Sequence, residues 1–123
     1  MAFPTAAPYN TFWYTRVIAL PEFWARARRL LSDEERAEFA DYIGANPESG
    51  KVIPGLKGVR KVRWGRGNLG KRGGVRIIYL YVVVKSTVYL LTIYAKGHQA
   101  DLTAAQRKAI LGAVAVLKGE VEA

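Results

Sequence analysis

The pattern of hydrophobic positions predicts a strand followed at once by a helix near the start of the chain. Residues 11–20 are aromatic and β-branched, the composition of a strand. Pro21 ends this stretch and suits the first turn of a helix, and apolar residues then recur at helical spacing. The apolar side chains on the inner face of this helix are Phe23, Ala27, Leu30 and Leu31.

A second helix is predicted directly after the first one. Ser32 and Glu35 have the spacing of a capping box, in which each side chain bonds the other residue's backbone N–H. Gly44 and the pair Asn46-Pro47 supply the stop. The apolar side of this helix is Phe39, Tyr42 and Ile43.

The second half of the chain alternates with the period of strands. A loop over 50–58 leads into 59–64, where apolar and charged residues alternate so that Lys61 and Arg63 share one face. The glycine-rich stretch 65–74 is expected to be a loop. Two apolar segments, 75–84 and 87–95, are predicted to be adjacent antiparallel strands that turn at Lys85 and Ser86. Thr103 and Gln106 then form a second capping pattern, which predicts a closing helix.

This order of elements predicts an α+β domain. We expect an antiparallel sheet of about four strands, with two N-terminal helices and a C-terminal helix packed on it. The helices are expected to cover one face and possibly an edge, which leaves the opposite face partly open. Residues 1–10 are predicted to be a mobile N-terminal arm, and residues 11–123 a single domain.

The composition argues against several common kinds of catalytic and metal site. The chain has no cysteine, so it has neither disulfides nor a cysteine zinc site, and His98 is its one histidine. Neither a paired-carboxylate site nor a phosphate-binding loop with the required Gly-Lys-Ser/Thr ending is found, and a Ser-His-Asp triad would have to use His98. We expect no metal and no cofactor. No secretory signal or membrane span is predicted, so a cytoplasmic location is expected.

The positive charge is concentrated in the middle of the chain. The formal net charge is +9, and no Asp or Glu occurs between Glu48 and Asp101. Such a distribution predicts a polyanionic partner or an acidic protein partner. The cations between these two acids are Lys51, Lys57, Arg60, Lys61, Arg63, Arg66, Lys71, Arg72, Arg76, Lys85 and Lys96.

A group of cations suits the cleavage of RNA, which carries its own nucleophile. The 2′-hydroxyl must lose its proton, the phosphorane must be stabilised, and the leaving 5′-oxygen must gain a proton. A lysine among other cations has a lowered pKa and can act as a base, whereas an arginine stays charged and holds two phosphate oxygens.

Four ordered segments carry a family resemblance. The runs GLKGVRKVRW, GKRGGVRIIYLY, YLLTIYAKG and DLTAAQRKAI resemble the RelE/ParE superfamily of type II toxin-antitoxin systems, especially the HigB-like branch. The resemblance covers about residues 52–111. It implies a RelE-like fold that enters the ribosomal A site, cleaves the bound mRNA to a 2′,3′-cyclic phosphate without a metal, and is held inactive by a cognate antitoxin protein.

The same resemblance assigns roles to individual residues. Lys61 and Arg63 match the paired basic residues for proton removal and substrate grip, and Arg76 matches the phosphate-stabilising arginine. Lys96 stands where related toxins have an arginine, and Tyr94 or His98 takes the place of a substrate-stacking tyrosine. The residues expected to bind RNA or the ribosome are Lys57, Arg60, Arg66, Lys71, Arg72 and His98.

Plainer interpretations remain open at this stage. Arg76 could be the structural ion-pair partner of a helix carboxylate such as Glu38, and Lys61 and Arg63 could form an ordinary solvated strand face. At the level of function, the alternatives are a ParE-like toxin that inhibits DNA gyrase, or a noncatalytic RNA-binding module.

Overall fold

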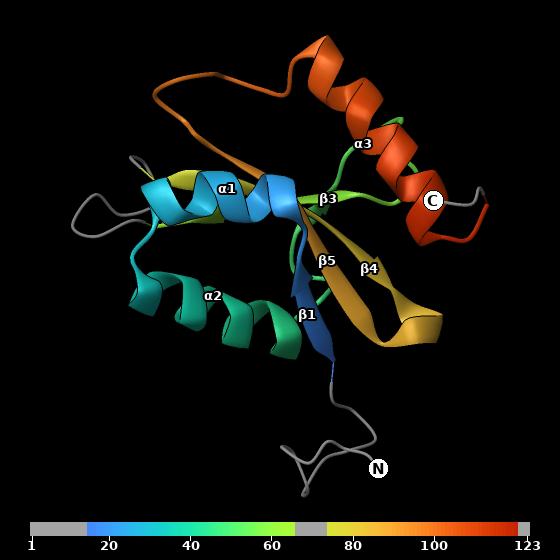
Figure 1. The fold of residues 1–123 in the computed structure, drawn as a ribbon, viewed down its shortest axis with the longest axis horizontal. Coiled ribbons are helices and arrows are strands. Elements are labelled where there is room, and N and C mark those ends of the chain that lie inside the picture. Colours follow the sequence, from blue (N-terminus) through green and yellow to red (C-terminus); the bar gives the residue numbers. More distant parts are fainter. Residues whose placement is uncertain (1–14, 66–73, 121–123) are drawn as a thin grey trace, which may run out of the picture.

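A five-stranded sheet with three helices forms the domain (Figure 1). The structure is a computed structural model that describes residues 15–65 and 74–120. The strand order in the sheet is β1-β5-β4-β3-β2. The elements are β1 (Arg16–Ala19), α1 (Pro21–Leu30), α2 (Asp33–Ala45), β2 (Lys51–Val52), β3 (Arg60–Trp64), β4 (Val75–Val82), a 3-10 turn (Val83–Lys85), β5 (Thr87–Ala95) and α3 (Ala104–Leu117).

The α+β class and the order of the predicted elements are confirmed, and the sheet differs from the prediction in two details. The sheet is mixed, because β1 pairs parallel to β5 while all other pairs are antiparallel. A fifth strand, β2, forms inside the predicted loop and is only two residues long, too short to give a periodic signal. The predicted arm 1–10 and the beginning of the predicted first strand lie outside the described residues.

The strand predicted over 75–84 ends two residues early. Val83 and Val84 belong to the 3-10 turn and are 63% and 92% exposed. Beyond Val82 no helix covers them, so their β propensity is not supported by packing. Ser86, with φ of 48°, completes the turn into β5.

The expectation that the helices cover a single face is wrong, because they lie on opposite faces of the sheet (Figure 1). Alternate residues of β4 belong to different cores: Ile77 packs with Phe23 and Phe39 from α1 and α2, whereas Ile78 packs with Ile110 from α3. A strand buried on both faces has a continuous apolar run, which explains why 75–84 shows little alternation.

Both predicted capping boxes are confirmed. Ser32 accepts from the Glu35 backbone N–H at 3.1 Å, and Glu35 accepts from the Ser32 backbone N–H at 2.8 Å. Thr103 and Gln106 make the same reciprocal bonds at the start of α3. Among the helices that the structure describes, none has the length and apolar character needed to cross a bilayer.

Tyr79 ties the centre of the sheet to the segment that follows α2. It is fully buried, and its hydroxyl accepts from the Gly50 backbone N–H and donates to the Pro47 carbonyl, each at 2.9 Å. Gly50 is required here, because a Cβ would lie 2.9 Å from the Tyr79 ring. Burial raises the pKa of the Tyr79 hydroxyl above 10.0, although the bond from Gly50 acts in the opposite direction.

We predict that Tyr79→Phe lowers the free energy of unfolding by about 1–3 kcal/mol, because it leaves two buried backbone groups without a partner. Urea unfolding at neutral pH measures this loss. Above about pH 10 the unfolded tyrosine ionises while the folded one stays protonated, so the wild type loses stability that the variant does not. The difference between the two proteins should therefore shrink with rising pH.

Tyr81→Phe is the matched control on the same face of β4. The Tyr81 hydroxyl makes no hydrogen bond within residues 15–65 and 74–120, so its removal should leave stability within about 0.5 kcal/mol of the wild type. A loss for Tyr79→Phe no larger than that of the control would contradict the role given to this hydroxyl.

Candidate active site

Three predicted site residues lie in one row across the sheet. Arg63 on β3 is directly opposite Arg76 on β4, and Arg76 is directly opposite Tyr94 on β5. Directly opposite residues have Cβ atoms about 4.5–5.5 Å apart. Lys61, two residues before Arg63 and opposite Ile78, lies on the same face. This face is the one that α3 covers further along, because Ile78 packs in the α3 core.

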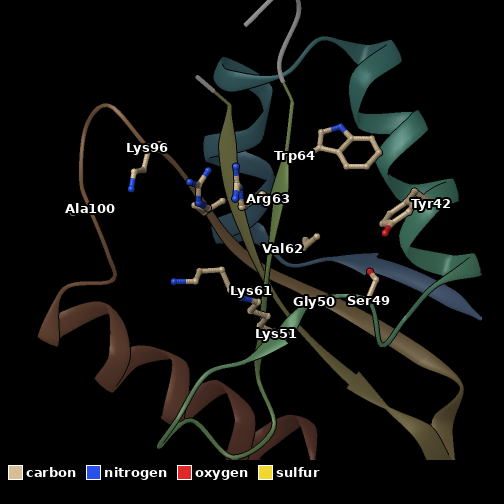
Figure 2. A pocket seen from close by; sticks show the side chains of 11 residues that line it. Tyr42, Ser49, Gly50, Lys51, Lys61, Val62, Arg63, Trp64, Lys96 and Ala100 are labelled. Atoms are coloured by element: carbon tan, nitrogen blue, oxygen red, sulfur yellow. The ribbon is translucent and has the colours of Figure 1, made fainter. Parts of the chain in front are cut away.

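Lys61, Arg63 and Arg76 border a cleft of about 620 Å³ at the rim of the sheet, whereas the buried Tyr94 does not line it (Figure 2). Five of its described lining residues are Lys or Arg, and none of them is Asp or Glu. We call this the cationic cleft. Its lining residues are Tyr42, Ser49, Gly50, Lys51, Lys61, Val62, Arg63, Trp64, Arg76, Lys96 and Ala100.

Gly74 holds the two arginines opposite each other. It lies at the start of β4, where the chain passes so close to β3 that a Cβ would be 2.1 Å from the Trp64 carbonyl oxygen. Only glycine allows this approach. The pairing of Trp64 with Val75, and therefore that of Arg63 with Arg76, depends on this contact.

Arg76 is the most unusual group in the cleft. Its Nη1 is buried and has no hydrogen-bond partner among residues 15–65 and 74–120, although Arg76 as a whole is partly exposed. Across the described chain, no carboxylate lies within 4 Å of Arg76 or of Arg63. The ion pair between Arg76 and Glu38 is therefore not present. A buried guanidinium nitrogen without a partner costs free energy, so it marks a position suited to an anionic ligand.

Tyr94 presents a second buried group without a partner. Its side chain is 2% exposed, and its hydroxyl makes no hydrogen bond within the described residues. Burial raises the pKa of Tyr94 above 10.0, and Asp101 adds to this increase, whereas Arg76 lowers it. The hydroxyl therefore stays protonated at neutral pH and can donate a hydrogen bond next to Arg76.

Lys61 has one weak acidic neighbour. Its Nζ lies 3.8 Å from Oδ1 of Asp101, which is 65% exposed and also accepts from the Leu102 backbone N–H. Such exposed pairs contribute little. Lys51 on β2 lies directly opposite Lys61, so the two lysines repel each other and Asp101 offsets only part of this repulsion.

Of the other predicted site residues, Lys96 lines the cationic cleft, whereas the rest lie elsewhere on the domain or outside the described residues. Lys96 is exposed and lines the cationic cleft. Arg60 lies on the opposite face of β3, where its Nη1 donates to the carbonyls of Glu48 and Gly50 at 3.0 and 2.7 Å. Lys57 and His98 are exposed but do not line the cleft. Arg66, Lys71 and Arg72 lie outside the described residues.

Sequence reasoning missed several residues of the site. Lys51 was placed in a loop, and only its pairing with Lys61 brings it to the cleft. Asp101 was used only as the end of the cationic stretch. Tyr42 and Trp64 line the same cleft, yet Tyr42 was assigned to the apolar side of its helix. The sequence offered one indication that Trp64 lies near the site, because Trp64 directly follows Arg63 in a strand whose residues alternate between the two faces.

The cleft can therefore hold an anion between several cations. Arginine side chains bind phosphate through two nitrogens at once, and lysine supplies a compact charge. Within the described ranges, no three His, Asp or Glu side chains are close enough together to hold a metal ion.

No protein-family model matches the chain. Two solved structures have a similar fold. A free-state structure of the E. coli toxin RelE with two arginines changed to alanine matches with a TM-score of 0.53 at 15% identity, over 71% of this chain and 88% of that one. The isolated E. coli RelE toxin matches with a TM-score of 0.52 at 16% identity, over 79% and 95%. At this identity the likeness shows that the chain has a RelE-like fold.

The effect of replacing Arg76 on stability can be predicted, because its Nη1 has no hydrogen-bond partner among the described residues. Arg76→Met removes an unsatisfied buried group and keeps an apolar stem of similar length, so we expect the free energy of unfolding to stay unchanged or to rise by about 1 kcal/mol. Urea unfolding measures it. A loss of more than about 1 kcal/mol would show that Arg76 has a structural role.

Arg36→Met is the contrasting variant. The Arg36 guanidinium donates to the Leu31 carbonyl at 2.7 Å, pairs with Asp33 and lies 4.7 Å over the Trp24 ring. Because these contacts join α1 to α2, this variant should lose about 1–3 kcal/mol.

Proposed function

We propose that this protein is the toxin of a type II toxin-antitoxin system and cleaves mRNA on the ribosome. The observation that supports this proposal is the meeting of Lys61, Arg63 and Arg76 in an open cleft where, among residues 15–65 and 74–120, neither arginine has a carboxylate partner. The RelE-like fold agrees with it. We place the chain in the HigB-like branch on the resemblance of its motifs.

In this proposal the cations bind and activate one ribose-phosphate linkage. Arg76 and Arg63 hold the two nonbridging phosphate oxygens and stabilise the additional charge that develops on the phosphorane. Lys61, in its neutral form, takes the proton from the 2′-hydroxyl. The 2′-oxygen then attacks phosphorus, and the bond between phosphorus and the 5′-oxygen breaks.

The leaving 5′-oxygen must receive a proton, and Lys96, which lines the cleft and is exposed, is placed to give it. The Tyr94 hydroxyl is buried beside Arg76 and does not line the cleft, so it needs a local rearrangement to act as the acid instead. The products are a 2′,3′-cyclic phosphate and a free 5′-hydroxyl, so the base and the acid together restore the proton balance. The reaction as proposed uses only the side chains of the chain.

The remaining partners follow from the same proposal. The ribosomal A site presents the mRNA, and exposed side chains outside the cleft, such as Lys57 and His98, contact ribosomal RNA. A cognate antitoxin with an acidic or amphipathic segment masks the cleft. We place the protein in the cytoplasm, where ribosomes are found.

We predict that induced expression halts translation and that Arg76→Met and Lys61→Met relieve this arrest. Loss of one group that stabilises the transition state lowers cleavage by about 10²–10³-fold. Sequencing of RNA 5′ ends after brief induction measures the cuts directly. Intact mRNA together with DNA damage signalling would favour a gyrase inhibitor, and intact mRNA bound to the protein would favour a noncatalytic module.

Arg29→Met and Lys108→Met are the matched controls. Arg29 on α1 and Lys108 on α3 are exposed and lie outside the cleft, and each control removes the same charge as its counterpart. Both should remain toxic. If the cleft variants are as toxic as these controls, the assigned site is wrong.

We also predict that binding to single-stranded RNA depends strongly on salt. Each phosphate that a cation neutralises contributes about −0.7 to the slope of log K against log salt. Replacing Arg63 by Met should make the slope shallower by about this amount, whereas Arg60→Met, on the opposite face, should not. Fluorescence anisotropy with a labelled oligonucleotide between low and moderate salt measures both slopes, and equal slopes for Arg63→Met and the wild type would count against the cleft as the binding site.

A further inference from the structure

The cationic cleft has a second wall that is aromatic. Tyr42 from α2 and Trp64 from β3 both line it, on the other side of β3 from Lys61, Arg63 and Lys96 (Figure 2). Trp64 directly follows Arg63, and successive residues of a strand point to opposite faces. We call Tyr42 and Trp64 the aromatic wall. None of the roles assigned to the cations of the cleft involves these two rings.

The rings of the aromatic wall are held firmly but are not closed off. The Trp64 ring meets Phe39 edge-on, with centroids 5.1 Å apart, and Phe39 is 1% exposed. The Tyr42 ring lies 5.2 Å from Trp64 on the other side and is 36% exposed. Phe39 therefore fixes the position of Trp64 from the core, while Tyr42 presents ring surface to the cleft.

The cationic side of the cleft and the aromatic wall are open to each other, because β3 is almost an edge strand at this point. β2 pairs only with Arg60 and Lys61, so Val62, Arg63 and Trp64 have a neighbouring strand only on the β4 side among the described residues. A chain held by Arg63 and Arg76 can pass over this open rim to the aromatic wall. Its polar groups would meet the free backbone edge of β3 on the way.

We propose that the aromatic wall stacks a base of single-stranded RNA next to the nucleotide whose phosphate the arginines hold. This inference rests on the proposed function and adds a base-binding subsite to it. Cations that follow a phosphate backbone, combined with exposed rings on which bases stack, are the usual means of binding single-stranded nucleic acid. An acidic peptide would use the cations but would gain nothing from the rings.

The test uses Trp64 as a reporter. The chain has three tryptophans, Trp13, Trp24 and Trp64, so a variant with Trp13→Phe and Trp24→Phe leaves Trp64 alone. The probe is a short oligonucleotide that lacks 2′-hydroxyls and cannot be cleaved. Its counterparts are an oligomer of the same length without bases, and an acidic peptide. Affinities are measured at low ionic strength by anisotropy of labelled probes, and Trp64 emission is recorded in parallel.

We expect only the base-bearing oligomer to change the Trp64 emission, and it should bind about 10-fold more tightly than the baseless one. Tyr42→Leu should remove most of this difference by weakening the base-bearing oligomer alone, and Tyr42→Phe, which keeps the ring, should lie closer to the wild type. Trp24→Leu changes an exposed aromatic outside the cleft and should affect neither oligomer.

Three results would overturn the inference. The first is an equal Trp64 response to both oligomers, and the second is equal weakening of both by Tyr42→Leu, since each shows that the rings do not contact bases. The third is an emission change with the acidic peptide alone. If both oligomers bind without involving the rings, the proposed function stands and only the subsite falls, whereas failure of both to bind counts against the RNA site itself.

Discussion

The arrangement of this domain depends on where an arginine can be placed on a strand that is buried on both faces. β4 passes between the α1/α2 layer and α3, and most of its side chains are fully enclosed. A charge within that enclosed part would have no route to water and no partner. Arg76 is tolerated because it lies at the start of β4 next to the cleft, and even there one of its nitrogens has no hydrogen bond to any residue that the structure describes.

The same placement explains why the cations of the cleft remain largely unneutralised. β3 brings Lys61 and Arg63 beside Arg76, and β2 adds Lys51. Within the described part of the chain, the acid within reach is Asp101, which is exposed and 3.8 Å from Lys61. Several like charges on adjacent strands destabilise the folded chain. Such a local excess of like charge is commonly found where a site is prepared for a ligand, because stability is often lower there.

The cleft also links the two cores of the domain. Lys61 and Arg63 lie on the α3 face of β3, while Trp64 packs against the core beneath α1 and α2, and the open rim of β3 separates them (Figure 2). Phe39 packs in the core and also supports the Trp64 ring that borders the cleft. The shape of this side of the cleft therefore depends on the position of α2.

The sequence by itself determined the features that depend on neighbouring residues. The capping boxes at Ser32 and Thr103, the helix start at Pro21 and the alternation that puts Lys61 beside Arg63 are all local, and the structure has each of them. Tertiary structure alone decided which face each helix covers, the parallel pairing of β1 with β5, the short strand that carries Lys51, and the meeting of Tyr42 with the cleft. These features depend on contacts between residues far apart in the chain, and a strand buried on both faces has no alternation that would reveal them.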